Sequence, residues 1–326
     1  MKQIRLGRTD LQVSRIAFGT WQLSGEWGAT DENAAISSIR HAADQGINFF
    51  DTAQGYGFGA SEGLLASALK GRPRDQFIIA TKGGLRPTDQ PGRADRDSSP
   101  DWIRQGVEAS LQALGSDYID LYQIHWPDPN TPFEVTAGAL DELVAAGKIR
   151  HVGVSNFDAD QMDEFSKTLP VETLQPPYHL FRRDIEATIL PYARAHDIGV
   201  LVYGPLGHGL LSGSMTEDTR FAPDDWRSKS PVFQGEAYKR NLRVVSSLQR
   251  FAEFELGTNV SRLAVAWVLA NPAVHVAIVG TRNPKHVDDA VAATDLKLDE
   301  RMMNAIAEII TAEVPVGGPS PETIWQ

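Results

Sequence analysis

The sequence contains no cysteine. This absence excludes disulfide bonds, thiolate nucleophiles, cysteine-based zinc sites and iron–sulfur clusters. Basic residues are in the minority, since 31 Lys and Arg face 42 Asp and Glu and the net charge is −11, so we do not expect a nucleic-acid partner. No stretch approaches the roughly 20 apolar residues of a membrane span, and the opening MKQIRLGRTDLQVS lacks the apolar centre of a signal peptide. We therefore expect a soluble cytoplasmic protein that does not bind membranes.

Short apolar runs recur along the chain and are separated by segments with helical periodicity. Eight such runs predict strands, at 16–19, 48–51, 77–82, 119–125, 151–156, 172–175, 199–204 and 275–280, and the run at 172–175 has the weakest pattern. Three of the intervening segments begin with a capping or proline signal and end at glycine: Thr30 to Gly46, Ser99-Pro100 to Gly115, and a capping box from Thr131 to Gly147.

This alternation predicts the architecture. Strands that alternate with helices pair in parallel through right-handed crossovers, and eight such units favour a closed (β/α)8 TIM barrel over an open sheet. The segment 261–270 is apolar nearly all round and predicts a buried extra helix. The stretch 204–235 is rich in Gly, Pro and Asp and indicates a long functional loop after the seventh strand. No linker divides the chain, so we predict one α/β domain over residues 1–326.

Polar residues stand where the predicted strands end. Active sites of such barrels lie at the carboxyl ends of the strands, which are occupied here by Asp51, Lys82 and His125, while Tyr56 follows on a loop between two glycines. A strand-end Asp, Lys or His taken alone is more often a turn residue, a solvated charge or a core histidine. Four such residues on one rim favour a catalytic site over four independent structural roles.

These four side chains predict acid–base chemistry on an oxygen atom. A lysine ammonium near a tyrosine favours the phenolate and lowers its pKa from about 10, so Lys82 would make Tyr56 a usable general acid. Asp51 would be the counter-charge of a buried Lys82, and a neutral His125 could donate to a carbonyl oxygen. No set of metal ligands accompanies them. Protonation of an oxygen while another group attacks its carbon describes carbonyl reduction.

The hydride donor needs a binding site of its own. No GxGxxG follows the first strand, so a Rossmann site is not indicated. The glycines of 204–209 could wrap a pyrophosphate, which taken alone is a weak signal. The stretch 280–285 after the eighth strand is a better candidate, because loops after strands seven and eight of such barrels commonly bind phosphate. Arg282 could hold a terminal phosphate there, although a surface arginine is an equally good interpretation without further context.

The chain resembles the aldo-keto reductase superfamily in six ordered motifs, FFDTAQGYG, ATKGG, QIHWPD, GVSNF, YGPLGHGLLSG and VGTRNP. The likeness begins at LGRTDLQVSRIAFGTW, covers nearly the whole chain and is greatest to bacterial members with short substrate loops. It implies a catalytic tetrad of Asp51, Tyr56, Lys82 and His125, with Tyr56 as the proton donor.

The resemblance also implies a nicotinamide cofactor, NADPH rather than NADH. Its carboxamide would be held by Ser155, Asn156 and Gln175 beside Asp51, and its ring would stack on Tyr203. The pyrophosphate would lie under the loop Gly204, Pro205, Leu206, Gly207, Gly209 and Leu210, helped by Arg227. The adenosine phosphate would meet Gly280, Thr281, Arg282 and His286, and Gly19, Thr20 and Trp21 would line the mouth.

The chain departs from the superfamily pattern in the cofactor region. Many relatives have a lysine where Ser214 stands, so one phosphate contact is weakened. Many also carry Asn or Gln further along, where this chain has His286 and Ala290. The implied preference for NADPH over NADH is therefore weaker, but NADPH is still the expected cofactor.

The predicted activity is the NADPH-dependent reduction of aldehydes or ketones to alcohols. Trp21, Trp27 and Trp126 would add flat surfaces for the substrate next to Tyr56 and His125. Those surfaces leave open a dehydrogenase or reductase for a sugar or sugar nucleotide. A cofactor-sensing protein similar to potassium-channel β subunits is a third, less favoured alternative. The sequence identifies neither the carbonyl, the direction of reaction nor the oligomeric state.

Overall fold

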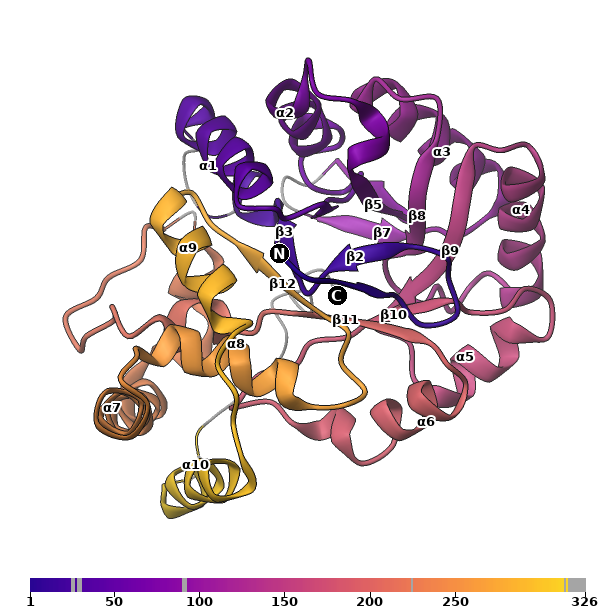
Figure 1. Ribbon diagram of the computed structural model, residues 1–326. Helices are drawn as coiled ribbons and strands as arrows, with labels where there is room; N and C mark the ends of the chain where they lie inside the picture. Colours follow the sequence, from indigo (N-terminus) through magenta and orange to yellow (C-terminus); the bar gives the residue numbers. More distant parts are fainter. Residues whose placement is uncertain (25–26, 28–30, 90–92, 224, 314, 316–326) are drawn as a thin grey trace.

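The computed structural model describes residues 1–24, 27, 31–89, 93–223, 225–313 and 315, and its centre is a closed barrel (Figure 1). The barrel strands pair in parallel in the order β10-β11-β12-β3-β4-β5-β8-β9. Their bounds are β3 (Ile16–Gly19), β4 (Phe49–Asp51), β5 (Ile78–Gly83), β8 (Ile119–Ile124), β9 (Ile149–Ser155), β10 (Thr173–Gln175), β11 (Gly199–Tyr203) and β12 (Val276–Gly280). All eight predicted strands are confirmed, including the weakly patterned β10, and so is the (β/α)8 fold class.

Helices surround the barrel and cover the outer faces of its strands (Figure 1). They are α1 (Glu32–Asp44), α2 (Ala60–Leu69), α3 (Pro100–Leu114), α4 (Phe133–Ala145), α5 (Ala159–Ser166), α6 (Ile189–Ala195), α7 (Gly235–Leu256), α8 (Val260–Ala270), α9 (Pro284–Ala293) and α10 (Glu300–Ala312). Both α7 and α8 lie between β11 and β12, and α8 is buried from Leu263 to Leu269, as its all-round apolar pattern predicts. Within the described ranges, no helix is long and apolar enough to cross a membrane.

The helix ends follow the predicted signals in part. The predicted cap of α1, Thr30, lies outside the described residues, and the cap that the structure shows is Asp31, whose carboxylate accepts from two backbone N–H groups. The capping box predicted at Thr131 is wrong. Its hydroxyl donates instead to Asp128 Oδ2 at 2.7 Å, and α4 begins after Pro132 without a side-chain cap. The proline start and the left-handed Gly115 end of α3 are as predicted.

A hairpin that the sequence pattern does not reveal closes one end of the barrel. Its strands, β1 (Gln3–Arg5) and β2 (Gln12–Ser14), are joined by a turn whose Leu6 and Leu11 are buried with the apolar side chains of the barrel interior. Gly7 in that turn has φ 51°, and a Cβ built on it would lie 2.2 Å from the backbone nitrogen of Gly199 on β11. Only a glycine permits this approach. A second unpredicted hairpin, β6 (Leu85–Pro87) with β7 (Ala94–Arg96), follows β5.

Candidate active site

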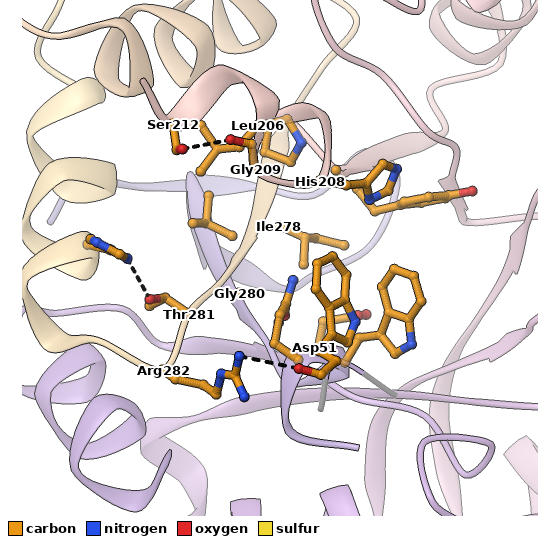
Figure 2. A pocket seen from close by; sticks show the side chains of 18 of the residues that line it. Asp51, Leu206, His208, Gly209, Ser212, Ile278, Gly280, Thr281 and Arg282 are labelled. Carbon is orange, nitrogen blue, oxygen red and sulfur yellow. Dashed lines mark hydrogen bonds between the residues drawn. The ribbon is translucent and has the colours of Figure 1, made fainter. Parts of the chain in front are cut away.

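A cavity of about 390 Å³ lies at the carboxyl ends of the barrel strands. Across it the loop after β11, with Leu206, His208 and Gly209, faces the segment Gly280, Thr281 and Arg282 that leads from β12 to α9 (Figure 2). The predicted site residues that line the cavity are Gly19, Trp21, Trp27, Asp51, Tyr56, His125, Ser155, Asn156, Gln175, Tyr203, Gly204, Pro205, Leu206, Gly209, Arg227, Gly280, Thr281, Arg282 and His286.

Four predicted binding residues do not line this cavity. Gly207 and Leu210 are buried in the loop after β11, and the hydroxyl of Thr20 accepts a hydrogen bond from Ser61 at 2.7 Å. Trp126 lies instead under the guanidinium of Arg96, which is 4.9 Å from its ring. To reach a ligand, each of these residues would have to use its backbone atoms, or the segment that carries it would have to move.

An ion pair lies beneath the cavity. Lys82 Nζ is 2.7 Å from Asp51 Oδ1 and 2.8 Å from the carbonyl oxygen of Thr52, and the lysine side chain is 0% exposed. The same ammonium donates to the Tyr56 hydroxyl at 3.5 Å. Strand order explains the proximity, because β4 and β5 are neighbours and deliver Asp51 and Lys82 to the same rim. The ammonium therefore faces a carboxylate on one side and a phenol on the other.

His125 completes the group predicted to act on the substrate. Its ring lies edge-on to Tyr56, with centroids 5.6 Å apart, and only 7% of the residue is exposed. Burial, and secondly the charge of Lys82, holds the pKa of His125 well below its ordinary value of 6.5. The imidazole is therefore neutral at physiological pH and has one N–H to donate. Among the described residues, its buried Nδ1 has no hydrogen-bond partner.

Two sets of hydrogen bonds connect polar groups at the carboxyl ends of the strands. The hydroxyl of Tyr203 donates to Asn156 Oδ1 at 2.9 Å, and Asn156 Nδ2 donates to the carbonyl oxygen of His125 at 3.0 Å. Gln175 Nε2 donates to Asp51 Oδ2 at 2.8 Å. Asn156 adopts a left-handed backbone, with φ 62°, which an asparagine tolerates only at some cost. This strained residue is held between the predicted catalytic group and the predicted ring-stacking tyrosine.

The cavity wall has the features that an extended cofactor requires. Gly19, Gly204, Gly209 and Gly280 all line it, so backbone rather than side chains forms much of its surface. A Cβ on Gly280 would lie 1.7 Å from Gln22 Oε1, an atom that is buried without a partner in the described chain. An unpaired oxygen at a side-chain-free wall suits a ligand that brings its own donors. The residues present therefore fit a nicotinamide dinucleotide.

The end of the cavity beside α9 carries the groups expected to meet the adenosine of the cofactor. Thr281 Oγ1 lies 3.0 Å from His286 Nδ1, and Arg282 Nη2 donates to the carbonyl oxygen of Trp27 at 3.4 Å. Asn283 caps α9 through a bond from the N–H of Lys285, which places the start of that helix beside the cavity. Cationic and hydroxyl side chains at a helix start are suited to a phosphate.

Other lining residues were not singled out from the sequence. His208 and Asn283 lie inside the stretches 204–209 and 280–285 predicted to meet the cofactor, but without a role of their own. The wall also holds residues outside both stretches, Gln22, Ser212, Met215, Ile278, Val279 and the noted Ser214. A histidine between two glycines, in GHG, was the one local signal that could have identified His208. Ile278 and Met215 carry no such signal, because apolar side chains on strands and loops are ordinary core residues.

We expect stability to fall as the pH falls below about 6.5. Burial lowers the pKa values of His125, His179 and His208, so protons bind these imidazoles in the unfolded chain before they bind them in the folded one. Each can therefore remove up to about 1.4 kcal/mol per pH unit below the unfolded value, while His151, with a raised pKa, contributes in the opposite direction. Urea unfolding across this range measures the slope.

The matched variants are His179→Asn and His196→Asn. The first removes one buried imidazole. It should reduce the dependence of the unfolding free energy on pH by the contribution of one proton, up to about 1.4 kcal/mol per pH unit. The second changes an exposed histidine and should leave the slope as it is. Equal slopes in both variants and the wild type would contradict the assignment of neutral buried imidazoles.

Comparisons with known proteins agree with this geometry. The Aldo/keto reductase family model matches residues 15–311. The chain is 43% identical to the aldo-keto reductase YhdN of Bacillus subtilis (strain 168), over 97% of this chain and 96% of that protein. It is 37% identical to the NADH-specific methylglyoxal reductase of Escherichia coli (strain K12), over 95% and 99% of the two chains. The solved glycerol dehydrogenase AKR11B4 from Gluconobacter oxydans is 42% identical, with a TM-score of 0.89 over 96% of both chains.

Proposed function

The chain belongs to the aldo/keto reductase family and is an NAD(P)H-dependent oxidoreductase, and from this premise we propose that it reduces small aldehydes and ketones to alcohols with NADPH. The observation that carries the proposal is the buried ammonium of Lys82, placed between Asp51 Oδ1 at 2.7 Å and the Tyr56 hydroxyl at 3.5 Å. When bound, the cofactor supplies hydride to the carbonyl carbon. The residues of this chain supply the proton and the orientation.

Tyr56 is the proposed proton donor to the carbonyl oxygen. As the phenol releases its proton, the negative charge that forms on it is stabilised by the ammonium of Lys82. Asp51 keeps that ammonium charged inside a site from which water is largely excluded. The neutral His125 donates a second hydrogen bond to the same oxygen, which fixes the carbonyl beside the phenol. Ser155, Asn156 and Gln175 are proposed to hold the carboxamide of the cofactor, and Tyr203 its ring.

The long loop 204–235 is proposed to cover the pyrophosphate. Gly204, Gly207 and Gly209 have φ values of 66°, 54° and 99°, which allow tight turns of the backbone over a ligand. Arg227 lies at the same wall, where Asp225 holds it at 2.6 Å and Trp27 packs against its guanidinium. In this arrangement the glycine backbone would form one wall of the pyrophosphate site, and Arg227 would supply a positioned cation at the other.

The rings beside the proposed proton donor favour a small substrate, because Trp21 stacks on Tyr56 with ring centroids 6.3 Å apart. Trp21 and Trp27, which line the cavity with their rings at 85°, provide an apolar face for such a molecule. Glycerol and methylglyoxal, which appear in the names of two relatives, are both three-carbon molecules.

The direct test is steady-state kinetics with NADPH and NADH on a panel of small aldehydes, ketones, diones and aldoses. Turnover of small carbonyls with a higher kcat/KM for NADPH supports the proposal. Tight binding of NADPH without turnover of any member of the panel would instead favour a cofactor-sensing role and overturn it.

Arg282→Ala is expected to reduce kcat/KM for NADPH by about tenfold to a hundredfold, because a charge-assisted hydrogen bond contributes about 1.5–3 kcal/mol. The reduction for NADH should be much smaller, since NADH lacks the adenosine 2′-phosphate. Arg301→Ala is the matched control, since its side chain is 69% exposed on α10. Arg282 also donates to the carbonyl oxygen of Trp27, and an effect through that loop alone would lower kcat/KM equally for the two cofactors.

A further inference from the structure

Glu62 is a buried carboxyl group that the proposed chemistry does not use. It lies in the first turn of α2, the helix that follows the loop of Tyr56, and none of its surface is exposed. Its Oε1 accepts a hydrogen bond from Thr81 Oγ1 at 2.6 Å. Burial raises the pKa of the Glu62 carboxyl above its ordinary value of 4.5, and the bond from Thr81 offsets this only in part. A group that is costly to bury and is fixed by a short hydrogen bond is a candidate for a positioning role.

The hydrogen bond of Glu62 reaches the neighbour of Lys82. Thr81 and Lys82 are consecutive in β5, and consecutive side chains of a strand point to opposite faces. Lys82 faces the Tyr56 hydroxyl, whereas Thr81 faces the helices outside the barrel. Glu62 therefore anchors α2 to the end of β5 that carries Lys82.

The same turn of α2 also holds the loop of Tyr56. The N–H of Ser61 donates to the carbonyl oxygen of Tyr56 at 3.2 Å. Nearer the start of the loop, the N–H of Gln54 donates to the carbonyl oxygen of Lys82 at 3.0 Å. The loop is thus fixed to α2 on one side of Tyr56 and to β5 on the other.

These contacts form a closed ring of covalent bonds and hydrogen bonds. From the carbonyl oxygen of Tyr56 the ring passes to Ser61 and along α2 to Glu62. It then crosses to Thr81, follows β5 to Lys82 and returns to the Tyr56 hydroxyl. The returning contact, at 3.5 Å, is the longest hydrogen bond of the ring, so its length depends on how the other links hold the two segments. Glu62 provides the link between helix and strand.

We propose that Glu62 is a positioning residue, which fixes the distance between the Lys82 ammonium and the Tyr56 hydroxyl through its hydrogen bond with Thr81. The inference rests on the proposed role of Tyr56 as proton donor. Reduction requires the protonated phenol, so activity falls as the pH rises through the pKa of Tyr56. A close ammonium lowers that pKa, and an ammonium that has moved away lets it rise toward its ordinary value of about 10.

Three further titratable groups face these side chains. Asp51 pairs with the ammonium on the side away from the phenol, and His125 lies edge-on to the ring of Tyr56. Tyr122 on β8 is fully buried, and its burial, together with the charge of Glu62, raises its pKa. The pKa of His125 is held well below 6.5. Neither His125 nor Tyr122 therefore changes its charge where the pKa of Tyr56 is expected.

Two variants break the proposed bond from opposite sides. Glu62→Leu removes the acceptor, and Thr81→Val removes the donor with little change of shape. Both should lower kcat by about tenfold to a hundredfold, the cost of a displacement of about 1 Å. Both should also move the alkaline limb of the pH profile of kcat/KM upward by about one unit, because lengthening this charge separation by about 1.5 Å weakens the interaction by that amount at an effective dielectric constant of about 20.

Further variants separate the hydrogen bond from general packing. Glu62→Gln keeps an acceptor oxygen and should retain both the alkaline limb and a kcat within about threefold of the wild type. The double variant Glu62→Leu with Thr81→Val should be no slower than either single variant, because both remove the same bond. Thr173→Val is the matched control. Thr173 is also a buried threonine of a barrel strand, but its hydroxyl has no partner in the described chain, so neither kcat nor the limb should change.

The pKa of Tyr56 can also be measured without turnover, from the phenolate absorbance of each protein minus that of its Tyr56→Phe counterpart. It should rise by about one unit in Glu62→Leu and in Thr81→Val. A lower kcat with an unchanged pKa would make Glu62 a merely structural residue and overturn the inference, as would a Glu62→Gln variant as slow as Glu62→Leu. If Glu62→Leu does not fold, Thr81→Val decides alone. If the wild type reduced no carbonyl, the proposed function would fail, and this titration would still decide the role of Glu62.

Discussion

Tyr56→Phe is expected to lower kcat by about 10²- to 10⁴-fold, the usual contribution of a positioned general acid. Phenylalanine keeps the stacking on Trp21, whose centroid is 6.3 Å away, and the edge contact with His125, so the hydroxyl is the group that is lost. The affinity for NADPH should stay within about twofold, because an interaction that forms only in the transition state affects kcat and kcat/KM together. Steady-state kinetics and a cofactor titration on the same preparation provide both values.

The matched control is Tyr118→Phe. Tyr118 packs its ring against the guanidinium of Arg74, 4.3 Å away, beside the other end of the barrel. Loss of its hydroxyl should not alter kcat. If Tyr56→Phe retained wild-type turnover, Tyr56 would not be the proton donor, and the proposed mechanism would have to be abandoned even if the protein proved to be a reductase.

Lys82→Met is expected to lower the free energy of unfolding by about 3–5 kcal/mol and to abolish most of the activity. Methionine is unbranched like lysine, one atom shorter and uncharged, so Asp51 would be left buried, 2% exposed, without its cation. The loss is therefore mainly the penalty of an uncompensated carboxylate. Urea unfolding at neutral pH measures it. Lys148→Met is the control, since its ion pair with Glu108 is exposed and such pairs contribute at most about 1 kcal/mol.

The double variant Asp51→Asn with Lys82→Met separates stability from catalysis. With both charges removed, much of the lost stability should return, because neither partner remains as a buried ion. Activity should not return, because no ammonium faces Tyr56. A single Lys82→Met variant as stable as the wild type would show that Asp51 does not depend on Lys82, and the proposed role of the ion pair would be wrong.

The central site residues could be predicted because of a property of parallel barrels. The carboxyl ends of all eight strands lie on one rim, so Asp51, Lys82 and His125 were expected to meet although they are far apart in the sequence. Short apolar runs and glycine stops located those ends to within a residue or two. The strongest local signals, strand ends and helix stops, are also the ones set by backbone geometry rather than by distant contacts.

The remaining features depend on contacts that a local pattern does not encode. The hairpin of β1 and β2 has strands of three residues, too short to show an alternation. The predicted capping box of α4 does not form, because the hydroxyl of Thr131 donates to the carboxylate of Asp128. The orientation of His208 requires Trp21 and Trp226, which come from separate loops and meet only in the folded chain. Residue propensities and motif spacing do not encode contacts between segments that are far apart in the sequence.

The seal of the barrel by the β1–β2 hairpin has a consequence for the order of folding. Leu6 and Gly7 lie against Gly199 at the start of β11, and the N–H of Arg8 donates to the carbonyl oxygen of Asp197 at 2.8 Å. The hairpin is synthesised long before β11. The surface against which the hairpin docks therefore does not exist when the hairpin leaves the ribosome. Contacts between distant parts of a chain form slowly, because the loop between them must first close. We expect insertion of the hairpin and closure of the barrel to be one late event in folding.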